Sequence, residues 1–118
     1  MTQPARILLA ILIALFPSIG CGGAPSVGKQ GVVVGGPCKD NSGCAQGSTC
    51  LAKGDFPDGT CSVPCSSDFG CPSGTKCIDK EGGVCLLLCQ SVSDCRSNYK
   101  CQPRDHFKIG GQSSVCIE

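Results

Sequence analysis

Cysteine is the residue type whose number and spacing point to chemistry in this sequence, with 13 cysteines in 118 residues. At this density in a short chain, cysteines form disulfides, bind metal ions or carry a covalent modification. One regular spacing runs from Cys38 to Cys116, whereas Cys21 stands apart near the N-terminus. The two groups therefore predict two different chemistries.

The regular group repeats a four-cysteine unit three times. Each unit reads Cys, five residues, Cys, five residues, Cys, a variable loop and a fourth Cys, and the units span residues 38–61, 65–85 and 89–116. The members are Cys38, Cys44, Cys50 and Cys61; Cys65, Cys71, Cys77 and Cys85; and Cys89, Cys95, Cys101 and Cys116. This register predicts one disulfide-rich domain over residues 38–118.

Disulfides are favoured over metal binding for these cysteines. Structural zinc sites usually place ligand pairs two to four residues apart, and the regular interval here is five residues. We therefore expect no metal and no cofactor, and keep metal storage as a third hypothesis. Four cysteines allow three connectivities per unit. We favour first with third and second with fourth, because a tight turn between the second and third cysteines folds the third back.

The N-terminal residues have the layout of an export signal. Arg6 is the only charge before the apolar run Ile7–Phe16, and Pro17 then breaks the run. A run of this length is too short to cross the bilayer as a helix, which takes about 20 residues. We therefore predict a signal peptide over residues 1–20 that is removed.

Cys21 follows this leader directly, and the twelve other cysteines can pair completely without it. Ser18-Ile19-Gly20-Cys21 resembles the lipobox of bacterial lipoproteins, although Ser18 stands where that family usually has leucine. The resemblance implies cleavage before Cys21, acylation of Cys21 and a lipid bilayer as partner. Gly22, in place of the aspartate typical of inner-membrane lipoproteins, implies the outer membrane. The alternative is ordinary cleavage that leaves Cys21 a free or intermolecular thiol.

Residues 21–37 follow as the lipidated cysteine and a connecting segment. Residues 22–37 contain six glycines, two prolines and one apolar cluster, Val32–Val34. This composition predicts a flexible tether with a reach of about 20–25 Å. The alternative is that the valine cluster adds to the folded part as an edge strand.

Within each unit the residues between cysteines predict a turn and a hairpin. Gly47, Gly74 and Asn98 occupy the same place before the third cysteine, and these residue types tolerate positive φ. Turn-rich loops then separate short apolar β-type segments that carry the third and fourth cysteines. The expected fold class is small and disulfide-rich, with three tandem four-cysteine units, short β-hairpins and little or no helix.

Two features of the sequence are candidates for interaction surfaces. Leu86, Leu87 and Leu88 form an apolar run whose simplest role is packing the second unit against the third, with at least one leucine facing out; the alternative is a partner-binding patch. The basic residues of the third unit, among them Arg96 and Lys108, are expected to be a solvated face.

Catalysis and nucleic-acid binding are not expected. His106 is the only histidine, and no serine lies in a nucleophile-elbow context. Without Arg6, nine basic and nine acidic residues remain of the 10 and 9 in the full sequence, so the mature chain is near neutral. Asp55 and Asp58 lack the alternating array of a calcium loop. We expect no catalytic residues.

Residues 38–116 resemble the cysteine-rich repeats of myxobacterial and related lipoproteins, and the unit is similar to the Dickkopf N-terminal cysteine-rich region. The resemblance rests on cysteine spacing and turn residues, and implies a fold class and an extracytoplasmic setting. The first hypothesis is a non-enzymatic, outer-membrane-anchored lipoprotein with an unknown protein or surface partner. The alternative is a secreted disulfide-rich ligand or inhibitor-like module.

Overall fold

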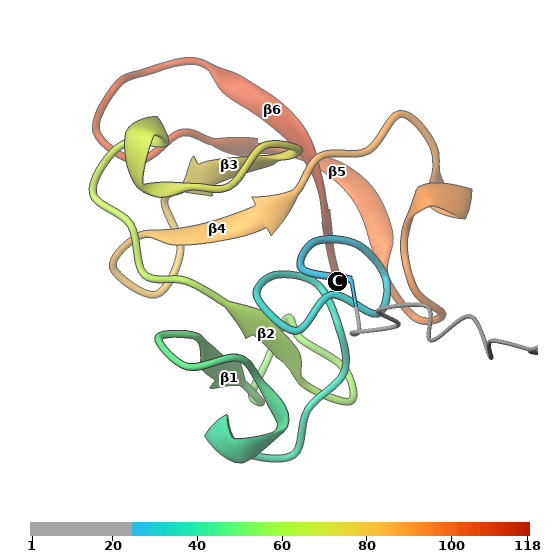
Figure 1. Ribbon diagram of the computed structural model, residues 1–118. Helices are drawn as coiled ribbons and strands as arrows, with labels where there is room; N and C mark the ends of the chain where they lie inside the picture. The colour runs from blue at the N-terminus through green and yellow to red at the C-terminus, as the bar shows by residue number, and fades with distance from the viewer. Residues whose placement is uncertain (1–24) are drawn as a thin grey trace, which may run out of the picture.

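The computed structural model describes residues 25–118, and these form three small β-hairpins in sequence order (Figure 1). The hairpins are β1 (Thr49–Leu51) with β2 (Thr60–Ser62), β3 (Thr75–Ile78) with β4 (Val84–Leu87), and β5 (Lys100–Asp105) with β6 (Gln112–Ile117), all antiparallel. Single 3₁₀ turns precede them: η1 (Asn41–Gly43), η2 (Asp68–Gly70) and η3 (Val92–Asp94). The predicted fold class is confirmed.

The predicted signal peptide, residues 1–20, and the predicted lipidation site, Cys21, lie outside the described residues. Within residues 25–118, no helix has the length and apolar character needed to cross a membrane.

Each unit is closed by two disulfides in the pattern that the sequence favoured. Bridges between first and third cysteines each have a sequence separation of 12, and bridges between second and fourth have separations of 17, 14 and 21. The pairs are Cys38–Cys50, Cys44–Cys61, Cys65–Cys77, Cys71–Cys85, Cys89–Cys101 and Cys95–Cys116. The third and fourth cysteines lie opposite each other in the hairpin, so each hairpin is bonded twice to the loop before it.

A left-handed turn makes this pairing possible. Gly47, Gly74 and Asn98 have φ of 88°, 87° and 71°, as their positions in the repeat predicted. The positive φ reverses the chain just before each hairpin and brings the third cysteine back to the first.

The expected flexible tether is wrong for residues 25–37, which we call the N-terminal strap. Val27 and Val34 form a parallel bridge, and Val34 is fully buried. The Ala45 N–H donates to the Val32 carbonyl at 2.7 Å. The strap is folded because a domain with so few large apolar residues gains from burying its valines.

Glycines in the strap serve close approach to β2 and β4. The Gly35 N–H donates to the Cys61 carbonyl at 2.8 Å, and the Cys61 N–H donates to the Gly36 carbonyl at 2.9 Å. These two bonds cover the free edge of β2. A Cβ on Gly35, where φ is +109°, would lie 2.6 Å from Leu87 Cδ1. The edge of β2 is therefore paired by the glycines after the valine cluster.

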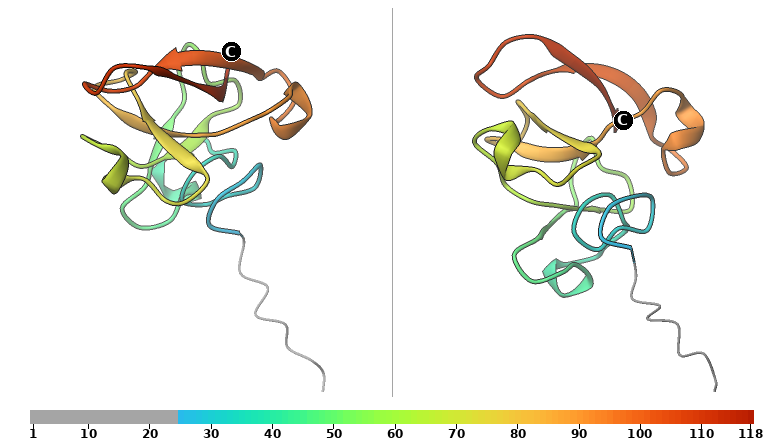
Figure 2. Two further views of the ribbon diagram at one scale, coloured as in Figure 1. Left: turned by 90° about the horizontal axis from the view of Figure 1, so that it is seen from above. Right: turned by 45° about the horizontal axis from the view of Figure 1, so that its top comes forward.

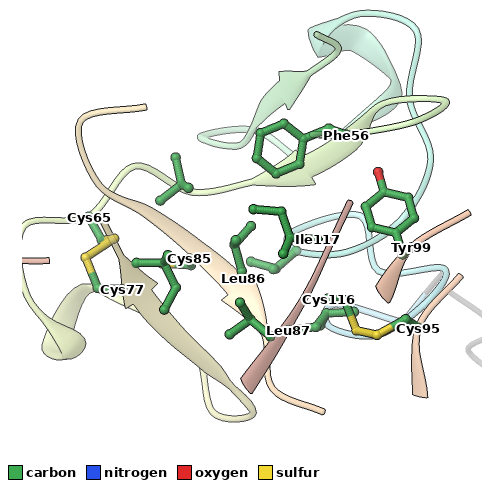
Figure 3. Packing of buried hydrophobic residues seen from close by; sticks show 14 residues of the cluster. Phe56, Cys65, Cys77, Cys85, Leu86, Leu87, Cys95, Tyr99, Cys116 and Ile117 are labelled. Atoms are coloured by element: carbon green, nitrogen blue, oxygen red, sulfur yellow. A yellow bond between two sulfur atoms is a disulfide. The ribbon is translucent and has the colours of Figure 1, made fainter. Parts of the chain in front are cut away.

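The core lies mainly between the second and third units (Figure 3). Ile78 and Leu86 of the second unit and Ile117 of the third are almost completely buried. Backbone bridges between Leu88 and Val115 and between Ile78 and His106 align the two hairpins. These units therefore share one apolar interior, above the β1–β2 hairpin in the view of Figure 1.

The first unit joins this pair through its loop and its last strand. Phe56, from the β1–β2 loop, is 2% exposed and belongs to the same buried cluster. The Ser62 hydroxyl donates to the Cys85 carbonyl at 2.7 Å, and the Cys85 N–H donates to the Val63 carbonyl at 3.0 Å. An ion pair between Lys80 and Asp55 adds a contact at the surface.

Candidate functional site

The twelve described cysteines form three compact sulfur clusters, one in each unit. The Sγ atoms of the first, second and fourth cysteines lie within 4.8 Å of one another in every unit; the groups are Cys38, Cys44 and Cys61; Cys65, Cys71 and Cys85; and Cys89, Cys95 and Cys116. All these sulfurs are in disulfides, so none is a thiolate able to ligate a metal. In the chain-entropy model each bridge contributes about 3 kcal/mol to stability.

Cys21 has no disulfide partner left within the chain. Every cysteine among residues 25–118 is bonded to another cysteine of its own unit, and Cys21 lies before the described residues. The sulfur of Cys21 is therefore available for a modification or for a bond to another chain.

The three leucines do not form a surface patch. Leu86 is 1% exposed and Leu87 is 9% exposed, and Figure 3 shows both inside the buried cluster. Both faces of β4 are covered, because one faces the core between the units and the other is covered by the strap at Gly35. Leu88 is 40% exposed and is the leucine that faces out. A partner-binding patch at Leu86 and Leu87 is thus wrong, and the packing role predicted for the run is correct.

Arg96 joins the first and third units, and this role was missed by treating it as part of a solvated basic face. Its Nη2 lies 2.8 Å from both Thr60 Oγ1 and Tyr99 Oη and also contacts the Gly59 carbonyl. The guanidinium carbon lies 4.8 Å from the centre of the Tyr99 ring. Tyr99 is buried, and its hydroxyl donates to the Pro57 carbonyl at 2.9 Å. The only sequence signal was the tyrosine three residues after the arginine, in a chain with a single tyrosine.

His106 and Ser113 face each other across the end of the β5–β6 hairpin. His106 Nε2 lies 2.7 Å from Ser113 Oγ, and Nδ1 lies 2.9 Å from the Gly110 carbonyl. A carbonyl oxygen can only accept, so Nδ1 donates in this contact, and in the neutral ring Nε2 accepts a hydrogen bond from the Ser113 hydroxyl. A serine and a histidine in hydrogen-bond contact are two parts of a nucleophilic site, but here Ser113 lies in β6 and His106 directly follows β5, where it forms a backbone bridge with Ile78. The contact instead closes the hairpin, together with the bond from Gln112 to Asp105.

A shallow hollow of about 790 Å³ lies on the first unit. It is lined by Pro37, Cys38, Lys39, Asp40, Ser42, Gly43, Ala52, Asp58 and Gly59. Hydrogen bonds from the Ser42 hydroxyl and N–H hold the pKa of Asp40 below its usual range, so this carboxylate is committed to capping η1. Besides Asp40, the polar side chains in its lining are Lys39, Ser42 and Asp58.

Phe69 is the most exposed large apolar side chain among residues 25–118. It lies in η2 and is fully exposed, whereas Val92 and Ile109 are exposed to 63% and 57%. The repeat register contained the signal for this residue: the fourth position after the first cysteine is Ser42 in the first unit, Phe69 in the second and Ser93 in the third. The second unit therefore presents an aromatic ring where the others present a hydroxyl.

Taken together, the described residues define a small disulfide-rich protein of three four-cysteine hairpin units. No protein-family model, curated protein or solved structure matches the chain. Its class therefore rests on the disulfide pairing and the hairpins themselves.

Proposed function

We propose that this chain is an exported, non-enzymatic lipoprotein, anchored in the outer membrane through acylated Cys21, with a role in surface interaction or envelope structure. The observation that supports it most is the closure of the other twelve cysteines in six bridges within units 38–61, 65–85 and 89–116. This closure leaves Cys21 as the one cysteine without an intrachain partner, directly after a leader-like segment.

The disulfides support export. Six bridges in a chain of this length require an oxidising compartment, since cytosolic thiols are kept reduced. Much of the buried cluster is sulfur, and its largest fully buried side chains are a few aliphatic residues such as Ile78 and Leu86. The domain therefore depends on conditions found outside the cytoplasm.

An acylated Cys21 is sufficient for stable attachment. Each buried methylene contributes about 0.8 kcal/mol, and two acyl chains on one residue hold a protein firmly at a bilayer. No spanning helix is then needed, and the folded domain remains outside the hydrocarbon.

The deciding experiment is the intact mass of the native protein, extracted in detergent and left unreduced. We expect the mass of Cys21–Glu118 plus acyl groups, less one pair of hydrogens per bridge. The Cys21→Ser variant serves as the control, because it should lack the acyl mass and partition into the aqueous phase. An unmodified Cys21 in the native protein would refute the anchor.

A second candidate, a secreted ligand or inhibitor-like module, is favoured by Phe69. A fully exposed aromatic ring on a frame held by disulfides is pre-organised for insertion into a pocket of a partner. The same mass measurement separates the candidates, since a released ligand has no acyl groups.

A further inference from the structure

We propose that the folded domain lies directly against the headgroups of the phospholipid bilayer that holds its anchor, with the strap turn around Lys29 facing the lipid. This inference rests on the proposed acylation of Cys21.

The start of the strap, at Pro25, is part of the folded domain. The Val32 N–H donates to the Pro25 carbonyl at 3.0 Å, and the Val33 N–H donates to the Ser26 carbonyl at 2.9 Å. With Val34 buried in the core and the edge of β2 paired to the strap, Pro25 is fixed to the rest of the domain. The folded domain therefore includes Pro25, thirteen residues before Cys38, where it would begin if residues up to Pro37 were a flexible tether.

The connection between Cys21 and the strap is short in sequence. Only Gly22, Gly23 and Ala24 separate Cys21 from Pro25. Four residue steps span at most about 14 Å when fully extended. An acylated Cys21 places its sulfur at the membrane interface, so Pro25 stays within this distance of the headgroups. Such a short connection keeps the nearest surface at high effective concentration against the bilayer, without any affinity of its own.

The strap turn follows Pro25 within four residues and is exposed. Lys29 and Gln30 are exposed at the tip of the strap turn, which is closed by the Gly31 N–H donating to the Gly28 carbonyl at 2.9 Å. A hollow of about 410 Å³ separates this tip from Arg96 and Ser97, just after η3. Lys29 is exposed there, and its positive charge also acts on the Asp94 carboxylate. An exposed ammonium group at this place suits contact with lipid phosphate groups.

The opposite side of the domain remains open to the surroundings. In Figures 1 and 2, η2 and the β5–β6 loop lie away from the blue end where the described chain begins. These two segments carry the exposed Phe69 and Ile109. A partner that contacts them would approach from the side away from the lipid.

The test measures acetylation rates of individual lysines by mass spectrometry, with the acylated full chain in vesicles of phosphatidylethanolamine and phosphatidylglycerol. The matched variant carries an insertion of about twenty Gly and Ser residues between Gly22 and Gly23, which extends the connection by roughly 25 Å. Lys108, exposed on the β5–β6 loop, is the internal control.

We expect Lys29 to react at least about threefold more slowly in the native protein than in the insertion variant, with Lys108 reacting equally in both. Equal rates for Lys29 in two acylated proteins would overturn the inference and leave the lipid anchor intact. The same slowing in both proteins would also overturn it, because the contact would not depend on the short connection. A mass without acyl groups would overturn the anchor and this inference together.

Discussion

The first unit has the same cysteine spacing and pairing as the second and third units, but different non-covalent contacts stabilise it. β3, β4 and β6 bury aliphatic side chains in a common interior, among them Ile78, Leu86 and Ile117. β2 instead buries Thr60, Cys61 and Ser62, and β1 is only half-buried. The first unit is held by Phe56, by the Arg96 junction and by the strap. Disulfides thus build the units, and different non-covalent contacts assemble them.

The largest expected effect comes from the shared interior. Leu86→Ala should lower the free energy of unfolding by about 4 kcal/mol, because a completely buried leucine leaves a cavity that a disulfide-bonded frame cannot close. Leu88→Ala is the matched control and should cost less than about 1 kcal/mol, since this side chain is 40% exposed. Urea unfolding of the oxidised proteins gives both values. Equal losses for the two leucines would contradict the buried position of Leu86.

Removal of one bridge should distinguish the two regions directly. The double variant Cys44→Ala with Cys61→Ala loses about 3 kcal/mol of chain-entropy stabilisation in the first unit. Because this unit shares little apolar interior, its amides should exchange faster while residues 75–87 and 100–117 stay protected. Removing Cys95–Cys116 should instead speed exchange in both the second and third units. If the Cys44→Ala and Cys61→Ala double variant exchanged its amides faster over the whole domain, the first unit would not be stabilised independently of the other two.

The strap can be loosened without touching a cysteine. Gly35→Ala should destabilise the domain by about 2 kcal/mol, because a Cβ there collides with the Gly28 carbonyl oxygen, meets Leu87 Cδ1 at 2.6 Å, and φ is +109°. Gly54→Ala has φ of +62° and no atom within 4 Å of the added Cβ, so it isolates the cost of φ and should lose only about 1 kcal/mol. Thermal unfolding compares the two. An equal loss would show that the packing around Gly35 leaves room for a Cβ.

The smallest effect is expected in acid, at the cap of η1. Hydrogen bonds from Ser42 lower the pKa of Asp40 from its ordinary value of 3.8. The carboxylate therefore contributes stability that is present above pH 3.8 and is lost as the pH falls through the lower folded pKa. Asp40→Asn should flatten the acid limb of the stability curve slightly, and Ser42→Ala should do so in part. If the acid limb were unchanged in Asp40→Asn, protonation of Asp40 would make no contribution to the loss of stability in acid.

Local features of the fold were predictable, and contacts between units were not. The cysteine register predicted the units, the pairing and the left-handed turns at Gly47, Gly74 and Asn98, because each depends on a few neighbouring residues. The strap was mistaken for a tether because glycine composition does not distinguish a mobile segment from one that needs close approach, as at Gly35. Arg96 was placed on a solvated face because its acceptors near Thr60 are far away in sequence. Alignment of the three units would have singled out Phe69, because the other two units have serine at the same position.

Confinement of every bridge to its own unit has a consequence for the way the chain acquires its covalent structure. Twelve cysteines can pair in on the order of ten thousand ways, whereas four can pair in only three. A chain that emerges N-terminus first can close the bridges of residues 38–61 before Cys65 is available. Sequential oxidation then reduces the search at each stage to three isomers, and a disulfide isomerase is needed only to correct errors within a unit.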